Sequence, residues 1–277
     1  MKNEELDLII EPGRIEKNYW SDLWRYRELF YILAWRDFKV RYKQTVIGVA
    51  WSVLRPLLTM IVMVVTFGKI AKLPSEGGAP YPILIMAGLL PWQFFANALT
   101  ESSNSLISNT NLFTKVYFPR ILIPASSIVL GFVDILITFV LALLIMASYR
   151  FVPSVNMVFL PFFFILTFFA SFGVGILMST LNLKYRDFRY IVPFIVQFGM
   201  FISPVAFSSS IVPEKYQLLY SLNPLVGIID GFRWCIIGGD VTLNIQSLLI
   251  SIVEITVLAI IGIQYFRKTE KMLADYA

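Results

Sequence analysis

The chain has 277 residues, of which 57% are hydrophobic, 16% aromatic and only 15% charged, and its formal net charge is +5. This composition excludes a soluble domain, whose exterior must stay polar, and it indicates an integral membrane protein. Because the chain has one cysteine and no histidine, it also excludes an intramolecular disulfide and a His/Cys metal site. The excess of Lys and Arg is typical of cytoplasmic loops, so we expect no nucleic-acid partner.

The N-terminal part, residues 1–47, is predicted to be a cytoplasmic tail followed by an amphipathic interface helix. It begins MKNEELDLIIEP, which is too polar and acidic for a cleaved signal peptide. From Trp20 to Lys43 apolar residues recur with helical period and cations share the opposite face, as in helices that lie in the headgroup plane. Because Gly48 follows with little slack, this helix either anchors the chain or transmits a push to the next segment.

Six hydrophobic spans, most of them 20 residues or longer, are predicted next. They lie at about 48–70, 82–106, 121–148, 155–181, 190–208 and 243–266. Lys and Arg gather before residue 48, after spans two and four, and in the tail 267–277, which places both termini in the cytoplasm. The predicted fold is therefore an all-α integral membrane protein with a six-span transmembrane domain at 48–266.

One further apolar segment, residues 216–237, is nearly long enough for a seventh span. Asp230 and Arg233 would then lie in lipid, where a charge costs at least about 2.5–3.5 kcal/mol. A seventh crossing would also move the cations of the C-terminal tail to the outer side. We therefore expect short re-entrant helices at about 211–237, between spans five and six, that dip into the outer leaflet.

Four ionisable residues fall inside the predicted spans, namely Arg55, Glu101, Asp134 and Glu254. Such residues are costly in a membrane, so each is expected to be a structural anchor or part of a functional site. Arg55 and Glu101 have similar depths near the cytoplasmic ends of spans one and two, and we expect them to pair. Asp134 and Glu254 are near mid-span and could relay protons, but no His or Lys accompanies them, which favours hydrogen-bonded packing.

Six sequence motifs together resemble one protein family. They are RDFKVRYKQTVIGVAWSVLRPL at 36–57, LPWQFF at 90–95, NTNLFTKVYFPR at 109–120, LNLKYRDFR at 181–189, SPVAF at 203–207 and LNPLVGIIDGFRW at 222–234. With these, the chain resembles the membrane (permease) subunits of type-two polysaccharide ABC exporters. The opening GRIEKNYWSDLWRYRELFYILAWRD is most like the O-antigen exporters of lipopolysaccharide biosynthesis.

This resemblance implies export of an undecaprenyl-linked polysaccharide from the cytoplasmic to the periplasmic side of the bacterial inner membrane. It implies a homodimer of this subunit with two ABC ATPase subunits, embedded in membrane lipid. Export of capsule, teichoic acid, a lipid or a drug by the same fold is the alternative. A secondary carrier or a membrane-embedded enzyme is less favoured, because the chain shows no convincing internal repeat and no cluster of His and acidic residues.

The chain has no G-x-x-x-x-G-K-S/T motif, so ATP and Mg would be bound by the partner ATPase, and this subunit would be no enzyme. By resemblance, a short coupling helix enters a cleft of that ATPase, and its residues are Asn111, Leu112, Phe113, Thr114 and Lys115. Further cytoplasmic contacts are expected at Arg36, Asp37, Lys39, Asp187 and Arg189. An ordinary connector with one exposed Phe is the alternative for the 109–119 loop.

A channel for a sugar polymer should be lined by aromatic side chains that stack on the apolar faces of the rings. The candidates for the channel and its gate are Trp51, Trp92, Phe94, Phe95, Phe198, Phe201, Phe207, Tyr216, Tyr220 and Trp234. Trp and Tyr also gather at membrane interfaces because of their contacts with lipid, so part of this set could face lipid instead.

Overall fold

A computed structural model describes residues 19–43, 46–113, 115 and 117–270, without the side chains of residues 43–49. The predictions for the N-terminal tail 1–18, the junction 44–45, Thr114 and the tail residues 271–277 lie outside these described residues. All regular elements in the described part are helical. The all-α class predicted from composition and periodicity is therefore confirmed.

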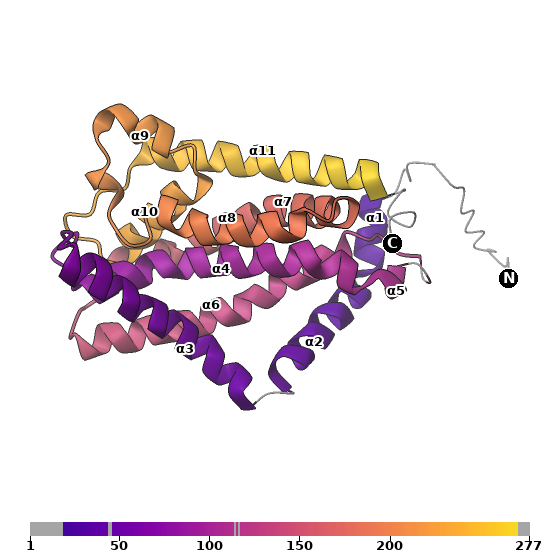
Figure 1. Cartoon of the computed structure of the whole chain (residues 1–277), viewed down its shortest axis with the longest axis horizontal. Helices are drawn as coiled ribbons and strands as arrows, with labels where there is room; N and C mark the ends of the chain where they lie inside the picture. The colour runs from indigo at the N-terminus through magenta and orange to yellow at the C-terminus, as the bar shows by residue number, and fades with distance from the viewer. Residues whose placement is uncertain (1–18, 44–45, 114, 116, 271–277) are drawn as a thin grey trace, which may run out of the picture.

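Five helical segments in the described part are long and apolar enough to cross a membrane. They are α3 with the π-helical η1 (Val46–Met63 and Val64–Ile70), α4 (Tyr81–Ser108), α6 (Leu122–Ser148), α7 (Leu160–Lys184) extended by η2 (Val155–Phe159), and α11 (Ile245–Glu270). They coincide with predicted spans one to four and six. α4 is the most buried of them and packs against α6 and α7, while α7 also packs against α11 (Figure 1).

α7 and α11 approach backbone to backbone through glycine. A Cβ on Gly173 would lie 2.6 Å from the backbone nitrogen of Ala259, and one on Gly262 would lie 2.4 Å from the carbonyl oxygen of Gly173. Glycine at these positions removes the side chain that would otherwise hold the two helices apart, as is common where membrane helices pack.

The predicted fifth span is shorter than expected. α8 covers Phe188–Ile202, which is 15 residues or about 22 Å, and it does not continue to residue 208. The chain turns extended at Ser203, because the proline at 204 disfavours helical geometry in the residue before it.

Short helices fill the connection from α8 to α11 at one end of the bundle, which we call the α10 end (Figure 1). They are η3 (Ser209–Ile211), α9 (Glu214–Tyr220) and α10 (Pro224–Ile236). α10 packs against α4, α7 and α11 and is almost wholly buried. The segment that the sequence analysis assigned to short outer helices is thus helical and does not form one long span.

The opposite end of the bundle, the α5 end, holds α1 (Tyr19–Arg25), α2 (Arg27–Lys43) and α5 (Thr110–Phe113). α2 runs obliquely from this end and forms a V with α3 (Figure 1), and it packs along α6. The guanidinium of Arg267 in α11 lies 4.8 Å from the ring centre of Tyr19 in α1. The first and last described helices therefore meet at the same end of the molecule.

Candidate functional site

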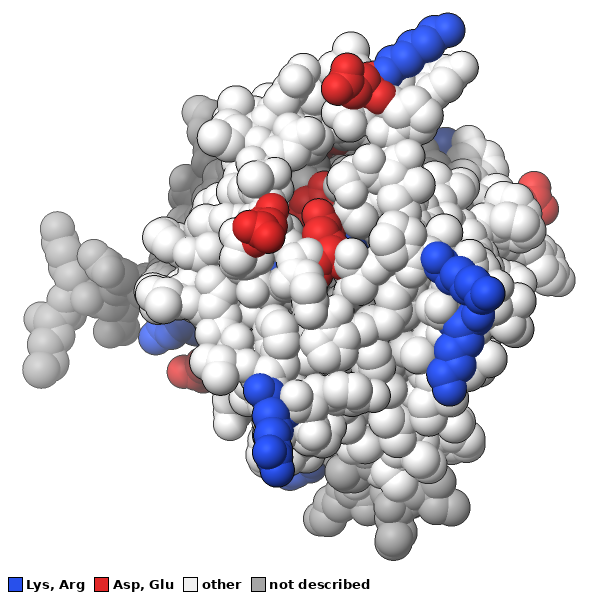
Figure 2. Space-filling model, turned by 90° about the vertical axis from the view of Figure 1, so that its left-hand side faces the viewer, with Lys and Arg blue, Asp and Glu red and all other residues white. Residues whose placement is uncertain are grey.

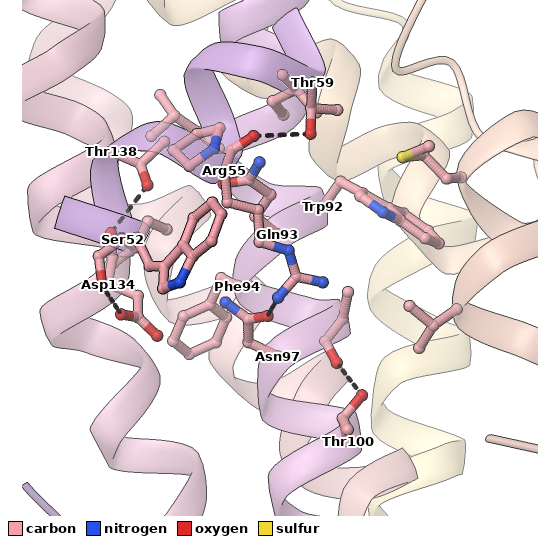
Figure 3. A pocket seen from close by; sticks show the side chains of 18 of the residues that line it. Ser52, Arg55, Thr59, Trp92, Gln93, Phe94, Asn97, Thr100, Asp134 and Thr138 are labelled. Carbon is pink, nitrogen blue, oxygen red and sulfur yellow. Dashed lines mark hydrogen bonds between the residues drawn. The ribbon is translucent and has the colours of Figure 1, made fainter. Parts of the chain in front are cut away.

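A cavity of about 640 Å³ is formed by α2, α3, α4, α6 and α8 (Figure 3). Its size falls within the range of roughly 300–1,000 Å³ that is typical of ligand sites. The wall combines aromatic rings with amides, hydroxyls and three charged groups. Its lining residues include Arg41, Trp51, Ser52, Arg55, Thr59, Trp92, Gln93, Phe94, Asn97, Thr100, Asp134, Thr138 and Gln197.

Two polar stripes on neighbouring helices line this cavity. On α3, Ser52, Arg55 and Thr59 recur at helical spacing, so they share one face. The corresponding stripe on α4 consists of Gln93, Asn97 and Thr100. Because both stripes border the same cavity, it has polar walls although both helices are largely apolar.

The predicted pair of Arg55 and Glu101 is not the pair that the structure contains. Arg55 Nη1 lies 3.5 Å from Oδ1 of Asn97, which precedes Glu101 by one helical turn on α4. Glu101 lies instead 3.7 Å from Arg41 in α2. Span one is thus linked to span two by Arg55 as expected, but through an amide one turn deeper in α4.

Asp134 is the centre of a polar cluster that the sequence analysis missed. Arg41 Nη2 lies 2.8 Å from Asp134 Oδ2. The hydroxyls of Tyr42 and Ser52 donate to Asp134 Oδ1 at 2.6 and 3.3 Å. The expected hydrogen-bonded role of Asp134 agrees with these contacts, but its cationic partner comes from α2, outside the predicted spans. A prediction from depth alone did not consider that helix, because it was expected to lie in the headgroup plane.

The burial of Tyr42 and its hydrogen bond to Asp134 both affect the phenol. Desolvation, and after it the hydrogen bond to the Asp134 carboxylate, raise the pKa of Tyr42 to about 12, so the hydroxyl stays protonated and keeps donating. Glu254, the other predicted mid-span carboxylate, is on α11 and does not line the cavity. Its buried Oε2 has no hydrogen-bond partner among the described residues, so the hydrogen-bonded packing expected of Glu254 is wrong.

The ten predicted channel aromatics are divided among several surfaces. Trp51, Trp92 and Phe94 line the cavity, and of these Trp51 is exposed whereas the other two are buried. Phe95 is buried with its ring 6.0 Å from that of Trp92. Phe198 on α8 is exposed and packs on Phe194. Exposed side chains also include those of Phe201 and Tyr216.

Phe207, Tyr220 and Trp234 lie apart from the large cavity, near the α10 end. The rings of Phe207 and Tyr220 are 6.5 Å apart, and Trp234 packs 5.6 Å from Phe159. The sequence identified these three residues as candidate channel aromatics, but it could not show that they lie away from the large cavity.

A second cavity, of about 170 Å³, lies at the α10 end, where Figure 2 shows acidic side chains around a hollow. Its charged lining residues are Glu76, Asp230 and Arg233. The fully buried Arg233 donates to the backbone carbonyls of Phe207 and Val205 at 2.7 and 3.1 Å. Burial raises the pKa of Asp230 to about 6, against the opposing effects of Arg233 and of a 2.7 Å hydrogen bond from a serine hydroxyl.

At the α5 end, the segment predicted to be a coupling helix is helical over Thr110–Phe113, and the phenylalanine of this helix faces inward. Phe113 is only 3% exposed and lies under the guanidinium of Arg120, 5.3 Å from the ring centre. Arg120 donates through its backbone N–H and its side chain to Glu270 at 2.7 and 2.6 Å. The alternative of an ordinary connector with an exposed Phe is therefore wrong, and so is the expectation that the Phe113 ring itself is presented to an ATPase. Asn111 and Lys115 are exposed and Leu112 is half-buried.

The remaining predicted contact residues also lie at this end. Arg36 donates to Asp37 at 2.7 Å and to Asn109 at 2.8 Å, so α2 is tied to the loop that carries α5. Lys39 is exposed beside Trp35. The α7–α8 connection presents two further exposed residues, Asp187 and Arg189.

Comparison with known proteins shows which family this chain belongs to. The family model for ABC-2 type transporters matches residues 28–237. The O-antigen export system permease protein RfbA of Klebsiella pneumoniae is 30% identical over 90% of this chain and 94% of its own length. RfbA of Myxococcus xanthus is 26% identical over 76% and 81%, and the polysialic acid transport protein KpsM of Escherichia coli is 20% identical over 86% and 92%. The chain belongs to the ABC-2 type transporter family.

Proposed function

We propose that this permease exports a lipid-linked polysaccharide of the O-antigen type across the bacterial inner membrane, driven by ATP hydrolysis on a partner subunit. The observation that carries the proposal is the large cavity, where Trp51, Trp92 and Phe94 lie beside amides and hydroxyls. Sugar rings have apolar faces and polar edges, so a wall of this composition suits them. A capsule-type glycan is the alternative, which the similarity to KpsM supports.

The proposed topology has six crossings with both termini in the cytoplasm. α1 and α11 meet at the α5 end, so the chain must cross an even number of times. Since five long spans are present in the described part, α8 supplies the sixth. Its length of about 22 Å is short for a bilayer core of about 30 Å, and local thinning or the turn after Ile202 makes up the difference. In this topology, η3, α9 and α10 are the re-entrant helices at the periplasmic side.

The α5 end is then the surface for two ABC ATPase subunits, which bind ATP and Mg. α2 and the α5 loop are joined there by the bond from Arg36 to Asn109, so a push on either one reaches the other. α2 in turn packs on α6 and grips Asp134 through Arg41. This chain of contacts leads from the ATPase surface to the wall of the cavity.

A second copy of the chain is proposed to complete the pathway. α3 is the least buried of the long spans, and α8 presents exposed Phe194, Phe198 and Phe201. Both helices border the cavity. A homodimer that pairs these faces would cover them and would place the two cavities beside a shared route.

Deletion of the gene tests this function in the native host. The expected result is lipid-linked polymer accumulating on the cytoplasmic face, with export restored by the wild-type chain. Trp92→Ala is expected to restore export only partly, whereas Phe169→Ala, which removes an exposed ring of α7 outside the cavity, should restore it fully. Normal surface glycan in the deletion strain would refute the proposal.

A further inference from the structure

Within the described residues, Arg55 is the one charged group of the large cavity without a partner of opposite charge. Arg41 and Asp134, the other two charged lining residues, neutralise each other at 2.8 Å. No described carboxylate lies within 4.0 Å of the Arg55 guanidinium, whose polar contact is the long one to Asn97. The cavity wall therefore carries one uncompensated positive charge.

The position of Arg55 in the span makes this charge informative. Its Cα lies about 8 Å along the helix from Ala50, the first residue of the span. A charge at membrane depth is costly, and it is tolerated where it faces a partner or a water-filled cavity. Since Arg55 lines a cavity of about 640 Å³, it is positioned to meet an anion that enters there.

The neighbours of Arg55 indicate which kind of anion fits. Gln93 and Asn97 bring amide groups to the same wall, and their NH2 donors suit an anion with several acceptor oxygens. A guanidinium binds phosphate through paired, charge-assisted hydrogen bonds. Trp51 lines the same cavity and is exposed, so its ring is available to stack on a sugar attached to such a phosphate.

We infer that Arg55, with Asn97, forms a binding site for the phosphate ester that joins lipid to sugar in the exported molecule. This inference rests on the proposed function, because it assigns the part of the substrate that the cavity binds. The depth is suitable, since an arginine a few residues inside a span can reach toward the headgroup region. The phosphate of an ordinary phospholipid has the same chemistry, so the experiment must separate the two sources.

The test is a binding measurement on the full-length protein in phosphatidylcholine nanodiscs, with radiolabelled farnesyl diphosphate as the probe. Arg55→Gln is expected to weaken binding at least tenfold. Arg55→Lys keeps the charge but loses the paired geometry, so its affinity should be intermediate. Lys69→Gln is the matched control, because it removes one positive charge from the same span outside the cavity, and it should bind like wild type.

Three competitors identify the source of the phosphate. Competition by unlabelled farnesyl diphosphate alone supports a lipid-linked substrate. Competition by inorganic diphosphate supports a site for the phosphate group itself, and competition by phosphatidylglycerol in the nanodisc supports phospholipid as the occupant and overturns the assignment to the exported molecule. Farnesol, which lacks the phosphate, should not compete, and if it does, the site binds the lipid chain and the inference is wrong.

Two outcomes separate this inference from the proposed function. Equal binding by wild type and Arg55→Gln, while the wild-type chain still exports glycan, would overturn the phosphate site alone. Binding that depends on Arg55 in a chain that exports no glycan would keep the site and refute the export proposal. If Arg55→Gln fails to assemble, the ranking of wild type, Arg55→Lys and Lys69→Gln decides, and equal affinities in these three overturn the site.

Discussion

The ion pair between Arg41 and Asp134 leads to the sharpest prediction about stability, because its two partners do not depend on each other equally. The side chain of Asp134 is 10% exposed and that of Arg41 is 29% exposed. Removing one partner of a buried pair costs about 3–5 kcal/mol, because the other charge stays buried without compensation. The partial exposure of Arg41 moves the expected value for this pair to about 3 kcal/mol or less.

Arg41→Met should cost about 3 kcal/mol, because it leaves the Asp134 carboxylate with only the hydroxyls of Tyr42 and Ser52. Asp134→Asn should cost less, about 1–2 kcal/mol, because Arg41 can turn toward Glu101, which is already 3.7 Å away. The double variant should be more stable than the sum of the two losses predicts, with a coupling energy of about 1–2 kcal/mol.

The assay is unfolding of the purified chain by dodecyl sulfate in mixed micelles, followed by tryptophan fluorescence. Arg25→Met, which removes an exposed cation from α1, is the control and should change the unfolding free energy by less than about 0.5 kcal/mol. Equal losses in both single variants together with a coupling energy near zero would refute the reasoning, since they would mean that the two charges do not sense each other.

Three further predictions concern packing, pH and the ATPase surface. Gly173→Leu should prevent normal assembly or cost more than about 3 kcal/mol in the same unfolding assay, because its Cβ would meet the backbone of Ala259 at 2.6 Å. The pKa of Asp230 is raised to about 6 in the folded chain, whereas an unfolded aspartate releases its proton near pH 4. The protonated Asp230 therefore contributes to stability below pH 4, and this contribution is lost as the pH rises to 6. Asp230→Asn should flatten the dependence of the unfolding free energy on pH between these values. Phe113→Ala should cost about 3 kcal/mol because the ring is buried, whereas Asn111→Ala should leave stability unchanged and reduce only the ATPase activity that a reconstituted complex shows.

The long helices were predictable because apolar runs of about 20 residues have few other solutions in a membrane. The end of α8 was not, although the proline after Ser203 was visible, because the prediction followed apolar composition beyond it. Helical periodicity predicted an apolar face on α2, but Tyr31 and Trp35 of that face are exposed in the structure, and periodicity does not identify the helix that packs against α2. For this reason Asp134 was left without its partner, Arg41, until the packing of α2 on α6 was known.

The candidate site was predicted in its residue types more than in its arrangement. Arg55 was singled out as a costly charge, but depth alone favoured Glu101 over Asn97, and these differ by a single helical turn. The loop that was predicted to couple to an ATPase lies at the α5 end, but the burial of its Phe113 depends on α11, which is remote in sequence. Phe113 is buried in one cluster with Phe266 of α11 and lies under Arg120, which is held by Glu270, and no local pattern contains these contacts.

The two arginines of the cavity have different roles: Arg41 stabilises the packing of the helices, and Arg55 is available to bind a ligand. Arg41 has a carboxylate at 2.8 Å and a second at 3.7 Å, so a ligand phosphate would have to compete with charges already in place. Among the described residues, the Arg55 side chain has one polar contact, the Asn97 amide oxygen at 3.5 Å, so an entering anion would have to displace no carboxylate there. Binding energy from an entering phosphate is therefore available at Arg55 and not at Arg41. Because Arg41 stays paired with Asp134, the contact between α2 and α6 is kept while a ligand binds and leaves. A subunit that receives the motion of an ATPase through α2 would need this contact to persist.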